Sequence, residues 1–439
     1  MTAFRPLVSI ATTDFSAVTR GRPVFEDGLE RAAQSGIGWV PANSSLTPFN
    51  SIADPNPWGS SGDLRLVPDL SARYRTSGTG AETPLDFVLG DIVELDGAPW
   101  SACPRGFLKH ALADLAERAG LSMIATFEQE FQLASVGGTA AHAFSIEALR
   151  RADPFAPRLA ACLAEAGVDP EMVLAEYGVD QFEVTHAPTD ALRAADRAIA
   201  VREITREVAR LLGRPATFSP KTSLEGVGNG VHVHFSFSSA DGAAAAYAGD
   251  RPGGLSDVAG AFCAGVLAHL PAFLALTASS VASYFRLKPH NWSSSYTWLA
   301  ERDREATLRI CPVATLGGRN PAPQYNIEFR AADASANPYL ALGAIVRAGM
   351  AGIEAALPTP PLVLGDPGAM TDAERAARGL RRLPESLEAA LSLFESDATV
   401  GSWFEPIVKQ TFVGMKRAEM AALAGLSPEE ICARYRAVY

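Results

Sequence analysis

Residues 123–133 read MIATFEQEFQL, a stretch in which Phe127, Phe131 and Leu133 alternate with polar side chains at 128, 130 and 132. This period of two is the pattern of a β-strand, whose successive side chains point to opposite faces of a sheet. Phe127 and Phe131 fall on one face, and Glu128 and Glu130 fall on the other. The stretch therefore predicts a strand with one apolar face and one acidic face.

Three further segments repeat this arrangement. The polar positions are Gln181, Glu183 and Thr185 in 181–185, His232 and His234 in 231–237, and Glu328 and Arg330 in 326–330. One solvated face per strand is the ordinary explanation, but such faces usually mix lysine with glutamate, and all four here lack lysine. Buried acids need neutralising partners, which bound cations can provide. Carboxylates with a histidine are typical ligands of magnesium or manganese, which accompany the phosphates of nucleotides.

Composition narrows the class of protein further. The chain has 439 residues, 48% of them hydrophobic, which is enough for two or three domains. A net charge of -11 argues against a nucleic-acid partner. We expect no signal peptide and no membrane span. The five cysteines include no CxxC pair, so we expect neither a disulfide framework nor a zinc site. We therefore expect a cytoplasmic location.

The order of the expected elements indicates an α+β protein. Residues 6–40 predict a small sheet with one helix, and residues 41–105, rich in Pro, Ser, Gly and Asp, predict loops with short strands at 64–67 and 86–88. Helices are expected at 105–119, 145–176 in two pieces, 190–212, 255–283, 338–357 and 371–439. No Walker-type phosphate loop occurs, and the glycine-rich GVGNG at 226–230 is a weak signal alone.

Five motifs in order resemble the signature set of the glutamine synthetase superfamily. They are FEQEF (127–131), EYGVDQFEV (176–184), ATFSPK (216–221), GNGVHVHFS (228–236) and IEFRAADASANPYLA (327–341). The resemblance is strong over roughly residues 100–360 and weaker in the N-terminal part. It implies an N-terminal β-grasp-like domain over residues 1–103. It also implies a C-terminal catalytic domain over residues 104–439, in which helices surround an antiparallel sheet, and a ring of ten or twelve subunits with active sites between neighbours.

The resemblance also implies roles for individual residues. The metal ligands are Glu130, Glu176 and Glu183 for one ion and Glu128, His232 and Glu328 for another, with two or three Mg²⁺ or Mn²⁺ per site. ATP is held by His234, Arg304 and Arg309, glutamate by Arg286 and Gly228, and Arg304 and Arg330 assist catalysis. Without the motif, Glu176 reads as an ordinary helix-end charge, and Arg302 and Arg319 read as surface or structural residues.

The reaction implied is ATP-dependent amide formation. The γ-carboxylate of glutamate takes the γ-phosphate of ATP, and an amine then displaces phosphate from the acyl phosphate. Two departures from the family pattern concern the amine: Ala42 stands where ammonia-using members have Asp, and Trp292 stands where they have Glu. Loss of both anions disfavours ammonium, so we expect an organic amine, with an amine that is neutral at pH 7 favoured. Glu301, Asp303 or Asp54 could restore the missing charge.

Other interpretations stay open at this stage. Val227 and Asn326 also depart from the pattern, and they leave room for a different acid substrate or for a catalytically silent homologue with a structural or regulatory role. All six metal positions are nevertheless Glu or His, which favours an enzyme. A guanidino kinase on a related fold fits EYGVDQFEV and NPYLA less well. Arg381 stands where some bacterial members carry an adenylylated tyrosine, so that switch is expected to be absent.

Overall fold

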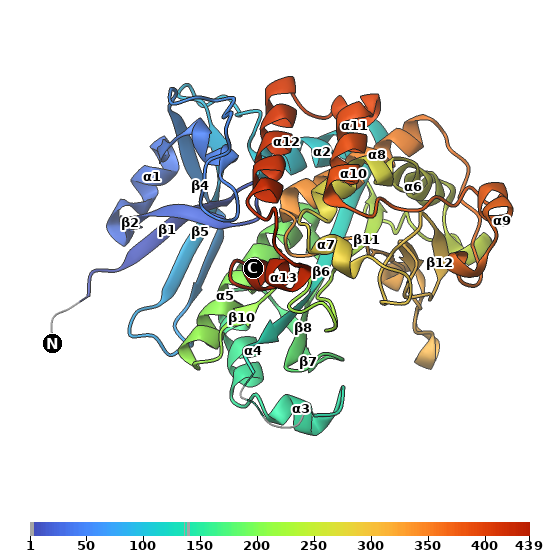
Figure 1. Ribbon diagram of the computed structural model, residues 1–439, viewed down its shortest axis with the longest axis horizontal. Coiled ribbons are helices and arrows are strands. Elements are labelled where there is room, and N and C mark those ends of the chain that lie inside the picture. The colour runs from blue at the N-terminus through green and yellow to red at the C-terminus, as the bar shows by residue number, and fades with distance from the viewer. Residues whose placement is uncertain (1–3, 136, 138–140) are drawn as a thin grey trace.

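The computed structural model describes residues 4–135, 137 and 141–439, and it contains two sheets (Figure 1). The first sheet has the strand order β2-β1-β5-β4-β3. Its strands are β1 (Leu7–Thr13), β2 (Thr19–Phe25), β3 (Ile37–Trp39), β4 (Leu64–Thr76) and β5 (Leu85–Val93). The short helices between them are η1 (Glu26–Gly28), α1 (Leu29–Ser35) and η2 (Pro41–Ser45). Helix α1 packs on β4, so this part is a small sheet carrying one helix, as the sequence predicts.

The second sheet is larger and follows the order β12-β13-β14-β11-β6-β8-β7, with β9 and β10 also paired to β6. Its strands are β6 (Leu121–Leu133), β7 (Pro170–Ala175), β8 (Gln181–His186), β9 (Thr189–Asp190), β10 (Ala216–Thr217), β11 (Val231–Ser239), β12 (Leu299–Glu301), β13 (Leu308–Ile310) and β14 (Ile327–Phe329). All its pairings are antiparallel except β12 with β13 in the part of the chain that the structure describes. The α+β class and the mainly antiparallel catalytic sheet are confirmed.

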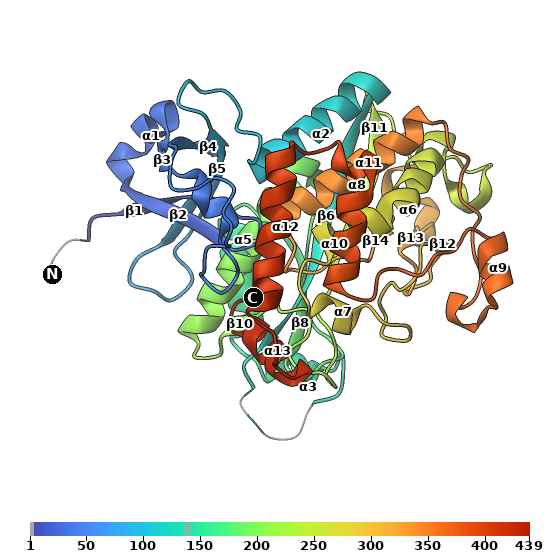
Figure 2. The same cartoon turned by 45° about the horizontal axis from the view of Figure 1, so that its top comes forward.

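Helices surround the second sheet. They are α2 (Pro104–Ala119), α3 (Ile146–Arg150), α4 (Phe155–Glu165), α5 (Ala191–Leu211), α6 (Asp257–Thr277), α7 (Ser283–Arg286), α8 (Pro338–Glu354), α9 (Asp372–Ala377), α10 (Leu387–Ser396), α11 (Ala398–Gly401), α12 (Pro406–Ala421) and α13 (Pro428–Arg436). Short 3₁₀ turns are η3 (Pro252–Gly254), η4 (Leu316–Gly318), η5 (Ala322–Gln324) and η6 (Pro367–Ala369). In both views α12 lies beside the first sheet (Figures 1 and 2), where it packs on η2.

Helix α6 covers the apolar face of the central strands. Phe262 contacts Phe235 of β11, and Phe273 stacks on Phe329 of β14, with ring centroids 5.4 and 6.3 Å apart. Among the described residues α6 is long and apolar enough to span a membrane by composition, but 72% of its apolar window is buried. We therefore assign it to the core. Because α6 covers the apolar face, the acidic face of the sheet points the other way.

Two sequence predictions differ from the structure. Residues 64–76 and 85–93 form long paired strands, where mostly loop was expected. The alternation in β4 is broken because its register with β5 shifts between Pro68 and Arg73, as at a β-bulge. Residues 170–175, expected to be helical, form β7 on the edge of β8. The preceding helix α4 ends at Glu165, and Gly167 follows with φ of 77°.

Arg105 joins the two parts of the molecule. Its buried guanidinium donates to both carboxylate oxygens of Asp196 in α5 at 3.0 Å. It also pairs with Asp69 of β4 at 2.8 Å and with Asp91 of β5 at 3.2 Å. Tyr339 of α8 donates to Asp196 at 2.6 Å. One charge network therefore ties the first sheet to α2, α5 and α8. The proposed division after residue 103 falls just before α2 and stays a prediction.

Candidate active site

The acidic face of the second sheet collects its polar side chains by strand register. Glu183 of β8 lies opposite Glu130 of β6, and Glu128 of β6 lies opposite His232 of β11. Directly opposed residues project to the same face of a sheet. Further along, His234 lies opposite Glu328 of β14, which in turn lies opposite Arg309 of β13. Five neighbouring strands thus present one row of carboxylates, imidazoles and a guanidinium.

The side chains in this row come close enough to share cations. His232 Nδ1 lies 3.5 Å from Glu128 Oε2 and 3.6 Å from Glu328 Oε1, and His234 Nε2 lies 3.2 Å from Glu128 Oε1. Three groups of side chains could each hold a metal ion, because within each group the potential ligand atoms lie within 4.8 Å of one another. The groups are Glu128–His232–Glu328, Glu130–Glu183–His232 and His234–Cys311–Glu328. The first reproduces one predicted ligand set, and the second contains two members of the other.

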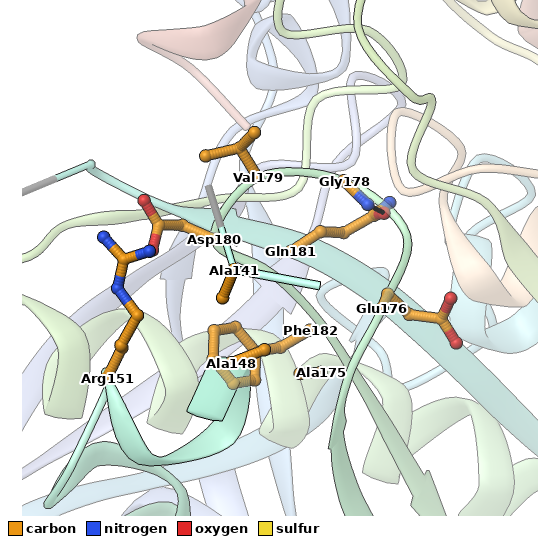
Figure 3. Close-up of a pocket in the computed structure, with 10 residues that line it drawn as sticks. All are labelled: Ala141, Ala148, Arg151, Ala175, Glu176, Gly178, Val179, Asp180, Gln181 and Phe182. Carbon is orange, nitrogen blue, oxygen red and sulfur yellow. Dashed lines mark hydrogen bonds between the residues drawn. The ribbon is translucent and has the colours of Figure 1, made fainter. Parts of the chain in front are cut away.

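Glu176 completes the other predicted set from a different kind of element. It follows β7 in a loop, and its backbone N–H donates to Gln181 O at 2.9 Å. Burial, followed by the charge of Glu130, raises the pKa of Glu176 to about 7. Glu176 also lines a small cavity with Arg151 and Asp180, but its carboxylate points away from these two residues (Figure 3). The charge of Glu130 thus acts on Glu176, and the predicted role of Glu176 as a metal ligand stays a prediction.

The two predicted ligand sets differ in electrostatics. Burial, and then the charges of Glu128, Glu130 and Glu176, raise the pKa of Glu183 to about 9. Burial opposes ionisation of Glu328 as well, but Arg330 and the two histidines outweigh it and lower the pKa of Glu328 to about 2. Carboxylates that repel one another fit a divalent cation, since its charge would stabilise their ionised forms.

The arginines surround the cluster at two depths. Arg309 Nη1 donates a hydrogen bond to Glu328 Oε2 at 2.7 Å, and Arg330 Nη1 donates one to Glu328 Oε1. Arg330 Nε also donates to Arg304 O at 2.7 Å. Arg304 is exposed, and its charge acts on Glu176. Arg286 is buried and donates to Ala332 O. The structure thus brings all four predicted arginines close to the cluster, where each interacts with a predicted ligand directly or through its charge.

Gly228 leaves room for Arg286. A Cβ at position 228 would lie 2.6 Å from Arg286 Cγ, and one at Gly230 would lie 3.1 Å from its guanidinium Nη1. A larger residue at position 228 or 230 would displace the arginine. The GVGNG segment is therefore explained by close approach to Arg286, and its amide at Gly230 donates to Glu130 Oε2 at 2.7 Å.

His234 is fixed by its neighbours. Its Nδ1 lies 2.9 Å from Asn326 Oδ1 and 3.5 Å from Cys311 Sγ. Burial alone would lower its pKa, but hydrogen bonds with Cys311 and Glu128 raise the pKa of His234 well above the usual value. A protonated imidazole at this position suits an anionic oxygen. Asn326, a departure from the family pattern, is therefore the partner that orients His234.

The residues expected at the amine differ in position. Trp292 lies at the site, since its carbonyl accepts from Arg330 Nη2 at 3.3 Å. Ala42 lies in η2, whose main contact is α12 of the same chain. The acid nearest to Trp292 by hydrogen bonding is Glu305, which the sequence reasoning missed: it accepts from the backbone N–H groups of His290 and Trp292 at 3.2 Å each. The sequence signal available was its place inside RDREAT, directly after Arg304.

The three acids expected to restore charge beside Trp292 have other surroundings. Asp303 accepts from the backbone N–H of Glu305 at 2.9 Å. Glu301 lines a separate cavity with Tyr247 and Tyr325, and Asp54 is exposed in the N-terminal part. The five cysteines are free and buried, as expected for a chain without a disulfide framework.

An acidic sheet face that gathers imidazoles and arginines is typical of metal-dependent enzymes that act on phosphate compounds. Family models for the glutamine synthetase N-terminal and catalytic domains match residues 2–100 and 101–434. The chain belongs to the glutamine synthetase family and is a carbon–nitrogen ligase. Enzymes of this family use ATP and divalent metal ions.

Individual relatives refine this comparison. The γ-glutamylpolyamine synthetase GlnA3 of Streptomyces coelicolor is 34% identical over 98% of this chain and 93% of its own. The glutamine synthetase of Pyrococcus woesei is 32% identical over 90% of this chain and 85% of its own length. The crystal structure of a novel glutamine synthase homologue superposes with a TM-score of 0.91, at 45% identity and full coverage of both chains. The structure of a GmaS complex with ADP superposes with a TM-score of 0.82, at 25% identity, and covers 97% of this chain and 95% of the GmaS chain.

Proposed function

We propose that this ligase joins the γ-carboxylate of glutamate to an organic amine. The observation that carries the proposal is the cluster of five candidate metal ligands on one face of the sheet, Glu128, Glu130, Glu183, His232 and Glu328, with arginines beside it. Glu176 joins them from the loop after β7. Similarity to a γ-glutamylpolyamine synthetase supports an amine other than ammonia. So does Trp292 at the position where ammonia-using members carry an acid.

Two groups of residues would hold the cations. Glu130, Glu176 and Glu183 form one set, and Glu128, His232 and Glu328 form the other. The donor set of carboxylates and imidazole suits Mg²⁺ or Mn²⁺. When bound, the ions supply positive charge that stabilises a transferring phosphoryl group. The pKa of about 9 for Glu183 supports this assignment, because the crowded acids need a counter-charge to ionise together at neutral pH.

The remaining charged groups serve the substrates. Arg286, set behind Gly228, is placed to bind a carboxylate of glutamate. His234, Arg304 and Arg309 would contact ATP phosphates, and Arg330 would stabilise charge as phosphate is transferred. The γ-carboxylate oxygen bonds to the γ-phosphorus as the bond to ADP breaks. The amine nitrogen then attacks the acyl carbon, phosphate leaves, and the amine gives up a proton.

Phosphate release tests the function directly. We expect ATP- and glutamate-dependent phosphate release with putrescine or ethanolamine that exceeds release with ammonia, with isopropylamine and aniline completing the panel. Glu183→Gln should abolish release. Glu385→Gln, a matched change at a surface acid paired with Arg382, should leave it unchanged. Equal release with ammonia and organic amines would refute the amine assignment, and no release with any amine would favour the silent homologue.

The assembly forms part of the same proposal. We infer a homo-oligomeric ring in which η2 of one subunit, with Ala42, serves the site of its neighbour. The support is the family membership and the position of Ala42 on η2, beside α12. Light scattering would give the mass in solution, with ten or twelve subunits expected and a monomer counting against it. A cytoplasmic location remains an expectation from the cysteine content.

A further inference from the structure

Three exposed aromatic side chains form a row beside the candidate metal cluster, with Tyr177 in contact with the other two. Phe144, Tyr177 and Trp292 are 52, 54 and 55% exposed. The Phe144 and Tyr177 rings meet edge to face with centroids 4.7 Å apart, and Tyr177 and Trp292 lie 5.4 Å apart. Single exposed aromatic residues are common, but a contiguous row marks a binding surface. We call this row the aromatic strip.

The strip is attached to the active site at both Tyr177 and Trp292. Tyr177 directly follows Glu176, and its backbone N–H donates to Glu176 Oε2 at 3.2 Å. Trp292 accepts at its carbonyl from Arg330, which is bonded to Glu328. The strip therefore leads away from the residues that would hold the phosphoryl group. A molecule that reacts at the cluster and extends outward would lie across these rings.

The Trp292 end of the strip also carries a negative charge. Trp292 has φ of 53°, a backbone conformation that residues other than glycine rarely adopt. Glu305 holds this conformation by accepting from the N–H groups of His290 and Trp292. A carboxylate offers about four acceptor positions, so two backbone bonds leave Glu305 able to accept from a ligand. Strained backbone of this kind concentrates at functional sites.

We propose that Phe144, Tyr177, Trp292 and Glu305 form a subsite for the distal ammonium group of a diamine or polyamine. The inference rests on the proposed function and names the amine class. Aromatic faces attract cations, and the effect is strongest for tryptophan. A carboxylate beside the rings adds charge complementarity. The missing acids at positions 42 and 292 favoured an amine that is neutral at pH 7. Glu305 supplies an anion beside Trp292 and reverses that preference.

A comparison of amines separates the parts of the subsite. The probes are methylamine, n-butylamine and putrescine, which share a reacting primary amine and differ in chain length and distal charge. We expect kcat/KM to rise from methylamine to n-butylamine and again to putrescine. A rise that stops at n-butylamine, or its absence altogether, would overturn the distal-ammonium assignment. Absence of phosphate release with every amine would instead refute the proposed function.

Substitutions then test the named residues through the ratio of kcat/KM for putrescine to that for methylamine. Trp292→Ala should lower this ratio about tenfold, whereas Trp292→Phe should restore part of it. Glu305→Gln should lower the ratio of putrescine to n-butylamine, and the wild-type ratio should fall as salt screens the charge. Phe4→Ala, at another exposed aromatic residue, is the matched control and should leave both ratios unchanged.

Two outcomes would contradict the subsite. One is an equal loss for all three amines in Trp292→Ala, which would indicate a structural role for the 290–292 turn. The other is an unchanged putrescine to n-butylamine ratio in Glu305→Gln. Binding of ATP, measured by calorimetry in each variant, shows whether the site is folded.

Discussion

The two halves of the carboxylate cluster contain similar ligands under opposite electrostatic conditions. In the half formed by Glu130, Glu176 and Glu183, the acids repel one another, and the pKa of Glu183 rises to about 9. In the half with Glu128 and Glu328, burial opposes ionisation, but Arg330 and the neighbouring histidines outweigh it and lower the pKa of Glu328 to about 2. In the first half, Glu176 and Glu183 need cations to be fully ionised at neutral pH. The second half is already ionised and held in place by the protein.

The largest expected effect on stability follows from removing the carboxylate of Glu328 in the half that the arginines neutralise. Glu328→Gln leaves Arg309 and Arg330 buried without their carboxylate partner. We expect the free energy of unfolding to fall by about 3–5 kcal/mol, because an uncompensated buried charge is costly. Chemical denaturation of the metal-free protein measures this. The comparison fails if Glu328→Gln is as stable as the wild type.

The opposite result is expected in the repelling half. Glu183→Gln removes a crowded acid, so the metal-free protein should be as stable as the wild type or slightly more stable. It should instead lose the stabilisation that Mn²⁺ gives, which is about 2.7 kcal/mol when the ion is present at a hundred times its dissociation constant. Thermal unfolding with and without Mn²⁺ distinguishes the two variants. A Glu183→Gln protein that Mn²⁺ stabilises as much as the wild type would remove Glu183 from the ligand set.

The two halves should also respond to pH in opposite directions. The folded-state pKa of Glu183, about 9, lies above its usual value of 4.5, so its contribution to stability is complete below 4.5 and is lost as pH rises toward 9. The contribution of Glu328, with a folded-state pKa of about 2, is present above 4.5 and is lost as pH falls toward 2. Metal-free stability should decline from pH 5 to 9, at most by on the order of 1 kcal/mol per pH unit. Glu183→Gln should flatten the decline, and an unchanged slope would contradict the assignment.

The smallest effect concerns the orientation of His234. Asn326→Ala removes the amide oxygen 2.9 Å from His234 Nδ1. The loss of one such hydrogen bond corresponds to about 1 kcal/mol, or roughly fivefold. We expect this increase in the KM for ATP, with KM for glutamate unchanged. Equal increases for both substrates would show that Asn326 supports the whole site rather than the histidine.

The sequence predicted the acidic face because that inference needs only alternation within each strand. Glu128, Glu183 and His232 each adjoin an apolar residue in the sequence, which points to the other face of the strand. The pairing of the strands then brings the three polar side chains together. The aromatic strip could not be predicted this way. Tyr177 and Trp292 are 115 positions apart by numbering and lie in loops whose geometry no alternation specifies. Strand β4 was underestimated since its register shift at Pro68 interrupts the alternation.

Arg105 bears on how the molecule can move. A single guanidinium paired with Asp69, Asp91 and Asp196 couples the first sheet to the helices that follow it. The N-terminal part should therefore unfold together with the catalytic part, in one cooperative transition, instead of opening and closing over the substrates. Any gating during turnover then falls to loops around the site, such as the turn at 290–292, whose Trp292 carbonyl accepts from Arg330.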